Sequence, residues 1–322
     1  MPLSTDMHRH WTADDIAPQS GKRVLITGAN SGIGYHAALT LARKGAHVVL
    51  VCRDKQRGEE ALARLQTGAP GACAELAILD LASLASVRLF AQRELAEQRR
   101  IHILINNAGV MAPPKRLETA DGFELQFGTN VLGHYALTAL LMPALELAAA
   151  GSPDRPRIVT IASIAHKGGR IEFDDLQSEK KYSSMQSYRQ SKLADLMFAI
   201  ELDRRLRAAD SRVISVAAHP GIANTNLFRS GDRSALSSAV RDLVSHMIGI
   251  VLNSEYAGAL PTLYAATSIR VNGGGYYGPQ GFLETRGSRI GEACVARQAM
   301  DELDAQRLWQ VCEALTQMRF RL

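Results

Sequence analysis

Short apolar runs alternate with longer amphipathic stretches along most of this chain, a rhythm typical of alternating strands and helices. The apolar runs predict seven strands, near residues 22–27, 46–51, 74–79, 101–105, 157–162, 213–218 and 275–277. The stretches with helical spacing predict helices near residues 32–44, 54–66, 83–98, 123–149, 184–208 and 253–268. Runs such as HVVLV and IHILI are continuously apolar, as strands covered on both faces should be. The pattern predicts an α/β protein with a Rossmann-type, doubly wound parallel seven-stranded sheet and helices on both faces.

The length and composition of the chain are compatible with one domain. The 322 residues are 46% apolar, enough for one large core, and doubly wound folds of this length often form a single unit. We expect residues 1–21 to be an N-terminal extension and residues 22–322 to form the domain. The extension is polar and lacks the apolar core of a signal peptide. No 18-residue uncharged apolar stretch is recognised, so no membrane span is predicted, and the chain is expected to be soluble and cytoplasmic.

Charge and cysteine content narrow the choice of partners. The formal net charge is +5, but basic residues alternate with acidic ones along predicted helices, as in RDKQRGEEALAR. Such mixing is typical of solvated helix surfaces, and no nucleic-acid-binding motif is visible, so no nucleic-acid partner is expected. The cysteines are expected to be free thiols in a reducing compartment, and no metal site is predicted, because they lie far apart. They are Cys52, Cys73, Cys294 and Cys312.

A glycine-rich turn lies between the first predicted strand and the first predicted helix. It contains Gly28, Asn30, Ser31, Gly32, Ile33 and Gly34. Glycines let backbone N–H groups approach a pyrophosphate, and a helix N-terminus favours its negative charge. The spacing is G-x-x-x-G-x-G rather than the more general G-x-G-x-x-G. A tight turn without a ligand is the alternative, but the helix begins at once and the strand HVVLVC follows at βαβ distance, which favours a phosphate cradle.

Tyr188 and Lys192 lie four residues apart on a predicted amphipathic helix and therefore share one face. A tyrosine hydroxyl, with an ordinary pKa of about 10, acts as an acid near neutral pH only if its phenolate is stabilised. A lysine ammonium on the same face would provide that stabilisation. Taken alone, such a pair could also be an exposed helical face with a solvated lysine. Its meaning therefore depends on the other motifs of the chain.

Four motifs occur in a particular order along the chain: TGANSGIG, NNAG at 106–109, a serine after the fifth predicted strand, and YRQSK. Together they resemble the short-chain dehydrogenase/reductase family from about Gly21 to Gly278, nearly the whole chain. The segments VCRDKQRGEEA, RIVTIASIAHKGGRIEFDDL and SYRQSKLADLMFAIELDRRL are similar to its retinol-dehydrogenase-like branch. That branch also includes light-dependent protochlorophyllide reductases and the oxidoreductase half of the WW-domain-containing oxidoreductase.

The cofactor is predicted from the end of the second strand. An acid at that position would bind the ribose of NAD and repel a 2′-phosphate. This chain has Arg53 instead, with Lys55 and Arg57 nearby, and a guanidinium suits a phosphate. Arg53 could also simply begin the basic surface of the next helix. The missing acid favours NADP(H).

The resemblance implies further cofactor contacts. Asp80 matches the position where relatives bind the adenine amino group, and capping of the helix near Ser83 is its alternative role. The turn around Asn107 would brace the sheet beside the ribose, and Thr225 matches the residue that binds the nicotinamide carboxamide. The remaining positions that match the cofactor site are Leu81, Ala108, Gly109, Tyr188, Lys192, Pro220 and Gly221.

The resemblance also implies a catalytic set of four residues. Ser163, at the end of the fifth strand, would hydrogen-bond the substrate carbonyl, and Tyr188 would exchange the proton with that oxygen. Lys192 would lower the pKa of Tyr188 and hold the nicotinamide ribose. Asn130 matches the position where relatives keep a proton-relaying water, although Ser163 alone could be a strand-end cap and Asn130 a buried helix amide. IAS replaces the commoner pair of serines, and 24 residues separate Ser163 from Tyr188, a longer insertion usual in the retinol-dehydrogenase-like branch.

These features predict NADPH-dependent reduction of a ketone or aldehyde, with the hydride from nicotinamide and the proton from Tyr188. The alternative is a catalytically silent NADP-sensing or interaction protein with the same fold. Residues near 222–252 break the rhythm of the chain, and the resemblance places a substrate-covering segment there; a connecting loop with one surface helix is the alternative. The sequence leaves open whether copies of the chain form a homo-oligomer. A lipophilic small-molecule substrate is suggested by apolar residues near the expected mouth of the site, namely Met111, Met185, Leu227, Phe228, Met247 and Ile248.

Overall fold

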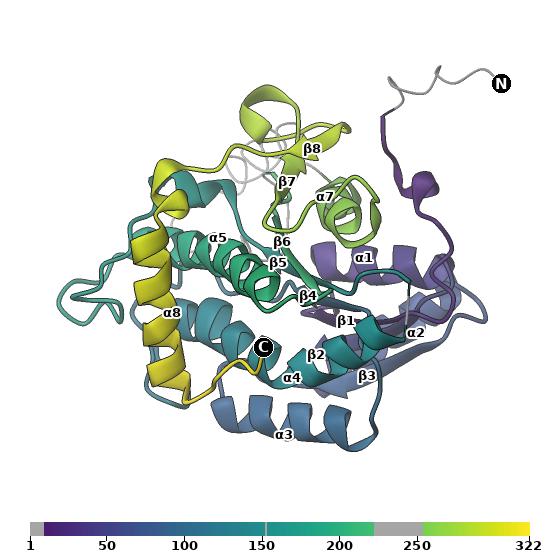
Figure 1. Cartoon of the computed structure of the whole chain (residues 1–322), viewed down its shortest axis with the longest axis horizontal. Helices are drawn as coiled ribbons and strands as arrows, with labels where there is room; N and C mark the ends of the chain where they lie inside the picture. Colours follow the sequence, from purple (N-terminus) through teal and green to yellow (C-terminus); the bar gives the residue numbers. More distant parts are fainter. Residues whose placement is uncertain (1–9, 152, 222–253) are drawn as a thin grey trace, which may run out of the picture.

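An eight-stranded sheet forms the centre of the molecule (Figure 1). The computed structural model describes residues 10–151, 153–221 and 254–322. The strand order is β3-β2-β1-β4-β5-β6-β7-β8; all neighbours are parallel except β7 and β8. The strands are β1 (Arg23–Thr27), β2 (His47–Cys52), β3 (Ala74–Ile78), β4 (Ile103–Asn106), β5 (Arg157–Ile161), β6 (Ile214–Ala218), β7 (Tyr276–Pro279) and β8 (Ile290–Glu292).

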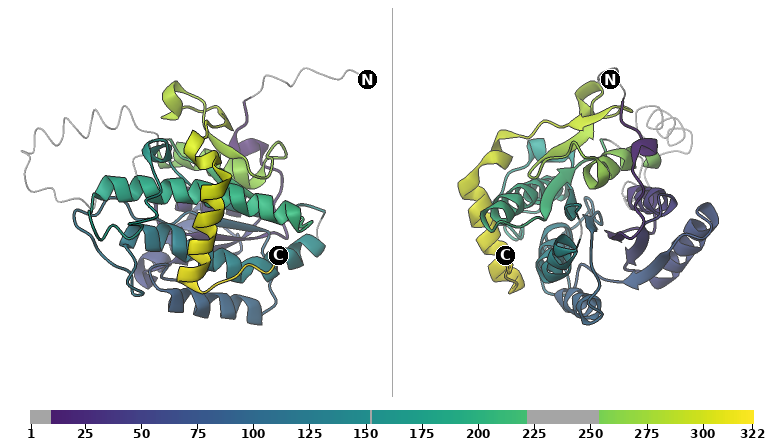
Figure 2. Two further views of the ribbon diagram at one scale, coloured as in Figure 1. Left: turned by 60° about the vertical axis from the view of Figure 1, so that its left-hand side comes forward. Right: turned by 45° about the vertical axis from the view of Figure 1, so that its right-hand side comes forward.

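Helices cover both faces of the sheet, as the continuously apolar strands require (Figures 1 and 2). One face is covered by α1 (Gly32–Arg43), α2 (Lys55–Gly68) and α7 (Glu255–Thr267). The other is covered by α3 (Leu84–Ala96), α4 (Gly133–Ala150) and α5 (Ser184–Ala208), and α8 (Glu302–Thr316) packs outside α5. Successive side chains of β1 enter opposite layers: Val24 and Ile26 lie in the core with α1, and Leu25 lies in the core with α4.

Short irregular helices connect these elements. The described 3-10 helices are η1 (Ala13–Asp15), η3 (Ile164–Gly168), η5 (Phe282–Glu284) and η6 (Arg297–Met300). A π-helix, η2 (Phe127–Leu132), leads directly into α4. Part of the predicted N-terminal extension packs on the domain, because the Trp11 ring lies edge-on to Tyr264 of α7 at 5.2 Å.

The predicted α/β class and parallel sheet are confirmed, with two corrections. The sheet has eight strands rather than seven, because residues 290–292 add an antiparallel edge strand to β7. The helix predicted near 123–149 is divided into a π-helix and α4. The predicted covering segment near 222–252 lies outside the described residues.

One described helical span, Phe127–Ala150, is long and apolar enough to cross a membrane, so the expectation that no such stretch exists is wrong. In the fold, 78% of its most apolar window is buried inside the protein. This span packs against α3, α5 and β4. Its composition is therefore explained by a place in the core.

The parallel strands all end at the same edge of the sheet. The predicted motifs lie in the turns that directly follow these strand ends. In doubly wound sheets, ligands bind where the strand order reverses, which here is between β1 and β4. The glycine-rich turn follows β1 and the NNAG turn follows β4. The fold therefore brings these two motifs together.

Candidate active site

The glycine-rich turn after β1 is shaped by contacts that leave no room for a side chain. Gly28 has a left-handed φ of +68°, and a Cβ there would lie 2.9 Å from the Ala108 Cα. A Cβ on Gly34 would lie 2.5 Å from the Asn107 Nδ2. Ser31 precedes α1 in an extended conformation and makes no side-chain cap, and the first turn of α1 contains no acid. The N–H groups at this helix start suit a phosphate.

Thr27 joins the glycine-rich turn to the NNAG turn. Its Oγ1 accepts hydrogen bonds from the backbone N–H groups of Asn107 and Ala108, both at 2.9 Å. The Asn107 Nδ2 donates to the Thr27 carbonyl at 2.7 Å. Asn106, directly before it, is buried and donates to the Thr138 hydroxyl of α4 at 3.0 Å. The predicted bracing role of this turn therefore agrees with its hydrogen bonds.

His134 extends the same network to Asn130, and its part was not predicted from the sequence. The ring is buried; its Nδ1 lies 2.9 Å from the Asn130 carbonyl and its Nε2 lies 2.9 Å from the Thr27 Oγ1. A carbonyl oxygen only accepts hydrogen bonds, so the His134 Nδ1 carries the hydrogen and Nε2 is an acceptor. Nε2 therefore accepts from the Thr27 hydroxyl, while the lone pairs of that hydroxyl accept from the N–H groups of Asn107 and Ala108. Burial lowers the pKa of His134 to about 4, which agrees with a neutral ring. Its spacing of four residues from Asn130 on a helix was the available signal.

Asn130 is buried in the π-helix η2, and its side chain is fully engaged. Its Oδ1 accepts from the Val110 N–H at 2.8 Å, and its Nδ2 donates to the Val110 carbonyl and the Ser191 hydroxyl, both at 3.0 Å. The side chain therefore holds the segment after the NNAG turn against α5. π-Helical turns occur frequently at functional sites. The alternative of a buried helix amide describes these hydrogen bonds, and the role beside a proton-relaying water stays a prediction.

Lys192 lies in the middle of this arrangement. A Cβ on Gly109 would lie 3.8 Å from the Lys192 Nζ and 3.3 Å from the Asn130 Oδ1. The Nζ donates to the Ile161 carbonyl at the end of β5 and to the Asp195 carboxylate, both at 2.8 Å. Burial alone would lower the pKa of Lys192, but the charges of Asp195 and Tyr188 keep it above the ordinary value. The alternative of a solvated surface lysine is therefore wrong.

Tyr188 and Ser163 lie on the site side of α5 and β5. Tyr188 is half-buried and close enough to Lys192 for its phenolate and the ammonium to interact. The Ser163 Oγ accepts from the Ala165 N–H at 3.2 Å, so Ser163 does cap η3. The described residues offer its hydroxyl hydrogen no recorded acceptor, which leaves that donor for a ligand.

Arg53 follows β2, is exposed, and makes no recorded hydrogen bond or ion pair within the described parts of the chain. The nearest acid in sequence, Asp54, caps α2 by accepting from the Arg57 N–H at 2.9 Å. Arg64 of α2, which was not predicted, donates to the Asn30 carbonyl at 2.8 Å and lies over the Tyr35 ring. Among the described residues, α2 therefore brings Arg64 to the glycine-rich turn, while Arg53 and Arg57 flank the start of the helix.

The other predicted cofactor residues occupy the same edge of the sheet. Asp80, half-buried after β3, accepts from the Ala82 N–H at 3.0 Å, whereas α3 is capped by Ser83. Leu81 is buried, and a Cβ on Gly133 would lie 2.4 Å from its carbonyl oxygen. Pro220 and Gly221 follow β6, with a left-handed φ of +72° at Gly221.

The apolar residues predicted near the mouth of the site are only partly described. Met111 is half-buried and Met185 is 41% exposed. Outside the described residues lie Thr225, Leu227, Phe228, Met247 and Ile248.

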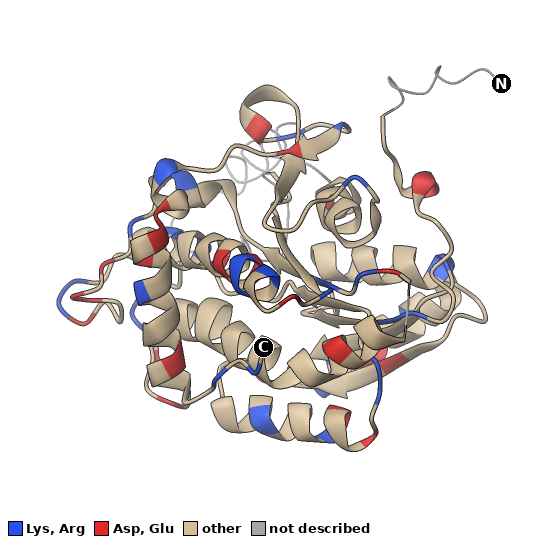
Figure 3. Cartoon of the chain, viewed as in Figure 1, with Lys and Arg blue, Asp and Glu red and all other residues tan. Residues whose placement is uncertain are grey.

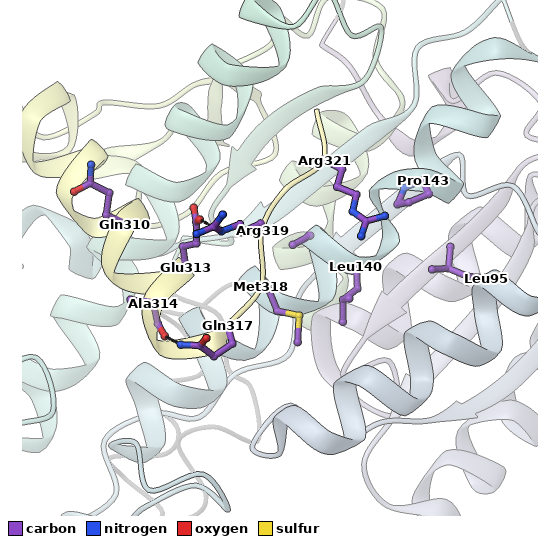
Figure 4. A pocket seen from close by; sticks show the side chains of 11 residues that line it. Leu95, Leu140, Pro143, Gln310, Glu313, Ala314, Gln317, Met318, Arg319 and Arg321 are labelled. Carbon is purple, nitrogen blue, oxygen red and sulfur yellow. Dashed lines mark hydrogen bonds and ion pairs between the residues drawn. The ribbon is translucent and has the colours of Figure 1, made fainter.

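A cavity of about 770 Å³ lies elsewhere, between α3, α4, α8 and the C-terminal residues (Figure 4). Leu95, Leu140 and Met318 line it together with polar side chains, and no predicted site residue does. It is therefore separate from the candidate active site. Within the described ranges, no group of three or more His, Cys, Asp or Glu residues could hold a metal ion.

A doubly wound sheet that joins a glycine-rich cradle to a buried lysine, a tyrosine and a serine defines an oxidoreductase that uses a nicotinamide cofactor. The chain belongs to the short-chain dehydrogenase family: the family model described as short chain dehydrogenase matches residues 22–235. Lys192, Tyr188 and Ser163 all lie within that match. The chemistry of such an enzyme is the interconversion of a carbonyl and an alcohol.

Curated relatives and solved structures agree with this assignment. Retinol dehydrogenase 14 from Mus musculus is 41% identical over 307 residues, which cover 92% of this chain and 86% of the relative. Retinol dehydrogenase 13 from Homo sapiens is 39% identical over 293 residues, with coverages of 90% and 82%. The solved structure of an uncharacterized protein from Mycobacterium Paratuberculosis is 38% identical, with a TM-score of 0.78 and coverages of 98% and 100%. L-Sorbose reductase from Gluconobacter frateurii, 20% identical with a TM-score of 0.62 over 79% of this chain and 92% of the reductase, shares the fold.

Proposed function

We propose that this protein reduces a lipophilic aldehyde or ketone to the alcohol with NADPH. The observation that carries the proposal is the buried Lys192 beside Tyr188, at the junction of the NNAG turn and β5. NADPH, when bound, supplies the hydride. The protein supplies the position of the carbonyl and the proton for its oxygen.

The residues divide this work as follows. The Ser163 hydroxyl, which donates to no other described residue, holds the carbonyl oxygen, and Tyr188 donates the proton to the same oxygen as the alcohol forms. The Lys192 ammonium stabilises the phenolate left behind. Asn130 keeps the NNAG turn and α5 at a constant spacing through Val110 and Ser191. In this scheme Tyr188, Ser163 and Lys192 touch the reacting groups, whereas Asn130 acts through its neighbours.

The preference for NADP over NAD rests on charge at the end of β2. Arg53 is exposed and has no hydrogen bond or ion pair to the residues that the structure describes, and the carboxylate of Asp54 is turned to the N-terminus of α2. A 2′-phosphate at this position would meet a guanidinium rather than an acid. Arg64, held at the Asn30 carbonyl, adds positive charge to the same side.

The substrate class rests on the relatives and on the apolar positions. The curated relatives at about 40% identity are named retinol dehydrogenases, whose named substrate is an apolar alcohol. Among the described residues, Met111 follows the NNAG turn and Met185 lies at the start of α5, and both are apolar. The cytoplasmic location inferred from the sequence is part of the same proposal.

A reduction screen tests the proposal. Purified protein is mixed with NADPH or NADH and with carbonyls that range from short polar aldehydes to long or polycyclic ones, retinal included, and cofactor oxidation is followed by absorbance. We expect turnover with NADPH and the best rates with the lipophilic carbonyls. Tight NADPH binding without turnover of any carbonyl would instead favour the silent sensing protein. Best rates with small polar carbonyls would refute the substrate class but not the reaction.

A further inference from the structure

Lys192 is held by an ion pair within its own helix. The Lys192 and Asp195 side chains are 7% and 4% exposed, and the Nζ–Oδ2 distance is 2.8 Å. The second bond of the ammonium, to the Ile161 carbonyl, is equally short. An ammonium has three N–H donors. One donor therefore remains for the side of the site, where Gly109 and Tyr188 lie.

Asp195 is the anion that accounts for a charged lysine at this depth. Burial disfavours an ammonium unless an opposite charge offsets the desolvation. The other titratable groups that face Lys192 are Tyr188 of α5 and His134 of α4, and burial keeps the latter neutral. Cys312 of α8 faces Asp195, and burial raises the pKa of that thiol well above its ordinary value, so it stays neutral too. Burial raises the pKa of Asp195 to about 6, so at neutral pH it is still a carboxylate and serves as the counter-charge.

The C-terminal helix α8 keeps water from this pair. Cys312 and Trp309 are both buried, and the Trp309 ring stacks on Phe198 of α5 at 6.0 Å. Figure 2 shows α8 lying across α5 on the outside of the molecule. Removal of water strengthens an ion pair but makes the loss of either partner more costly.

We propose that Asp195 is a positioning residue for the reaction: it keeps the Lys192 ammonium charged and directs its third N–H towards Tyr188 and the cofactor ribose. The motif Y-x-x-x-K specifies the lysine but says nothing of an acid three residues later. This assignment rests on the proposed function, because the Lys192 charge matters only if Tyr188 transfers a proton.

The first test is the pH profile of carbonyl reduction by the Asp195→Asn variant. Asparagine keeps the shape and an acceptor oxygen but removes the negative charge. Without the carboxylate, the Lys192 ammonium loses the charge that offsets its burial, so its proton leaves at lower pH. We expect the alkaline midpoint of turnover to fall by at least about one pH unit, a tenfold change in proton affinity. An unchanged midpoint means a merely structural role, and an upward shift means the opposite electrostatic role; either result overturns the assignment.

A matched control is Asp203→Asn, which removes a buried carboxylate that pairs with Arg207 further along α5. We expect a less stable protein with the wild-type midpoint. A shift equal to that of Asp195→Asn would show that any buried charge on α5 moves the profile, and the assignment would fail.

The second test needs no turnover, and it covers the case in which Asp195→Asn does not fold, because the double variant should then fold although the single variant does not. The unfolding of the cofactor-free protein is measured for Asp195→Asn, Lys192→Met and the double variant. Because the single changes each leave an unpaired buried group, we expect the double variant to be more stable than the sum of the singles predicts. Additive losses, or a double variant that does not fold, would overturn the assignment. A wild-type protein that reduces no carbonyl would refute the proposed function. The stabilities of the two single variants and the double variant would still show whether Asp195 and Lys192 form a stabilising ion pair.

Discussion

The glycine-rich turn offers a prediction in which two kinds of cost can be separated. Gly28 and Gly71 have similar left-handed φ values, +68° and +78°. A Cβ at Gly71 would meet nothing within 4 Å, whereas a Cβ at Gly28 would lie 2.9 Å from the Ala108 Cα, a backbone atom that cannot turn away. The change Gly71→Ala therefore carries only the backbone cost, and Gly28→Ala carries the same cost together with displacement of the NNAG turn.

The backbone cost of a Cβ in the left-handed region is about 1–2 kcal/mol. Forcing extra volume into a packed position adds about 1–3 kcal/mol. We therefore expect Gly71→Ala to lower the free energy of unfolding by about 1–2 kcal/mol and Gly28→Ala by roughly 2–5 kcal/mol. Only Gly28→Ala should weaken NADPH binding, by at least about tenfold, because the cradle lies beside it.

Denaturant unfolding of the cofactor-free variants measures the free energy of unfolding, and fluorescence titration with NADPH measures the affinity for the cofactor. Equal losses of stability in the two variants would show that the contact with Ala108 has no cost. Wild-type NADPH affinity in a folded Gly28→Ala protein would refute the cradle itself.

Two further predictions concern charge. Arg53→Ala should reduce the preference for NADPH over NADH by about 1.5–3 kcal/mol, the scale of a charge-assisted bond, and titration of both nucleotides measures it; equal affinities in the wild type would refute NADP selection. Because burial lowers the pKa of His134 to about 4 from 6.5, the unfolded chain binds more protons between these values, so stability is present above pH 6.5 and falls towards pH 4. Between pH 7 and pH 4, the free energy of unfolding should therefore fall by about 3 kcal/mol less in His134→Asn than in the wild type. The same pH dependence of unfolding in the variant and the wild type would contradict this prediction.

The strands could be predicted because a strand that is buried on both faces is continuously apolar, as HVVLVC is in β2. β8 contains no such apolar run. Its three residues, IGE at 290–292, form a strand only through their pairing with β7. The π-helix was not predictable either, because LQFGTNVL reads as ordinary helical spacing. Acidic and basic residues are interspersed over the helices in Figure 3, as their mixing in the sequence indicated.

The motifs predicted which residues meet at the site but not what holds them there. Gly109, Asn130 and Lys192 come together as expected, yet the partners that fix them, His134 and Asp195, belong to no motif. Each is a buried polar residue of a helix, and only the tertiary structure shows which buried group it satisfies.

The central claim is that Tyr188 supplies the proton in an NADPH-linked carbonyl reduction. Tyr188→Phe removes one hydroxyl and little volume, so folding and NADPH affinity should stay close to wild type. Turnover of the best carbonyl found in the reduction screen should fall by at least roughly 100-fold. The control Tyr256→Phe removes a hydroxyl from a residue of α7 that is 46% exposed and should leave the rate unchanged. Near-normal reduction by folded, NADPH-bound Tyr188→Phe protein would contradict the account.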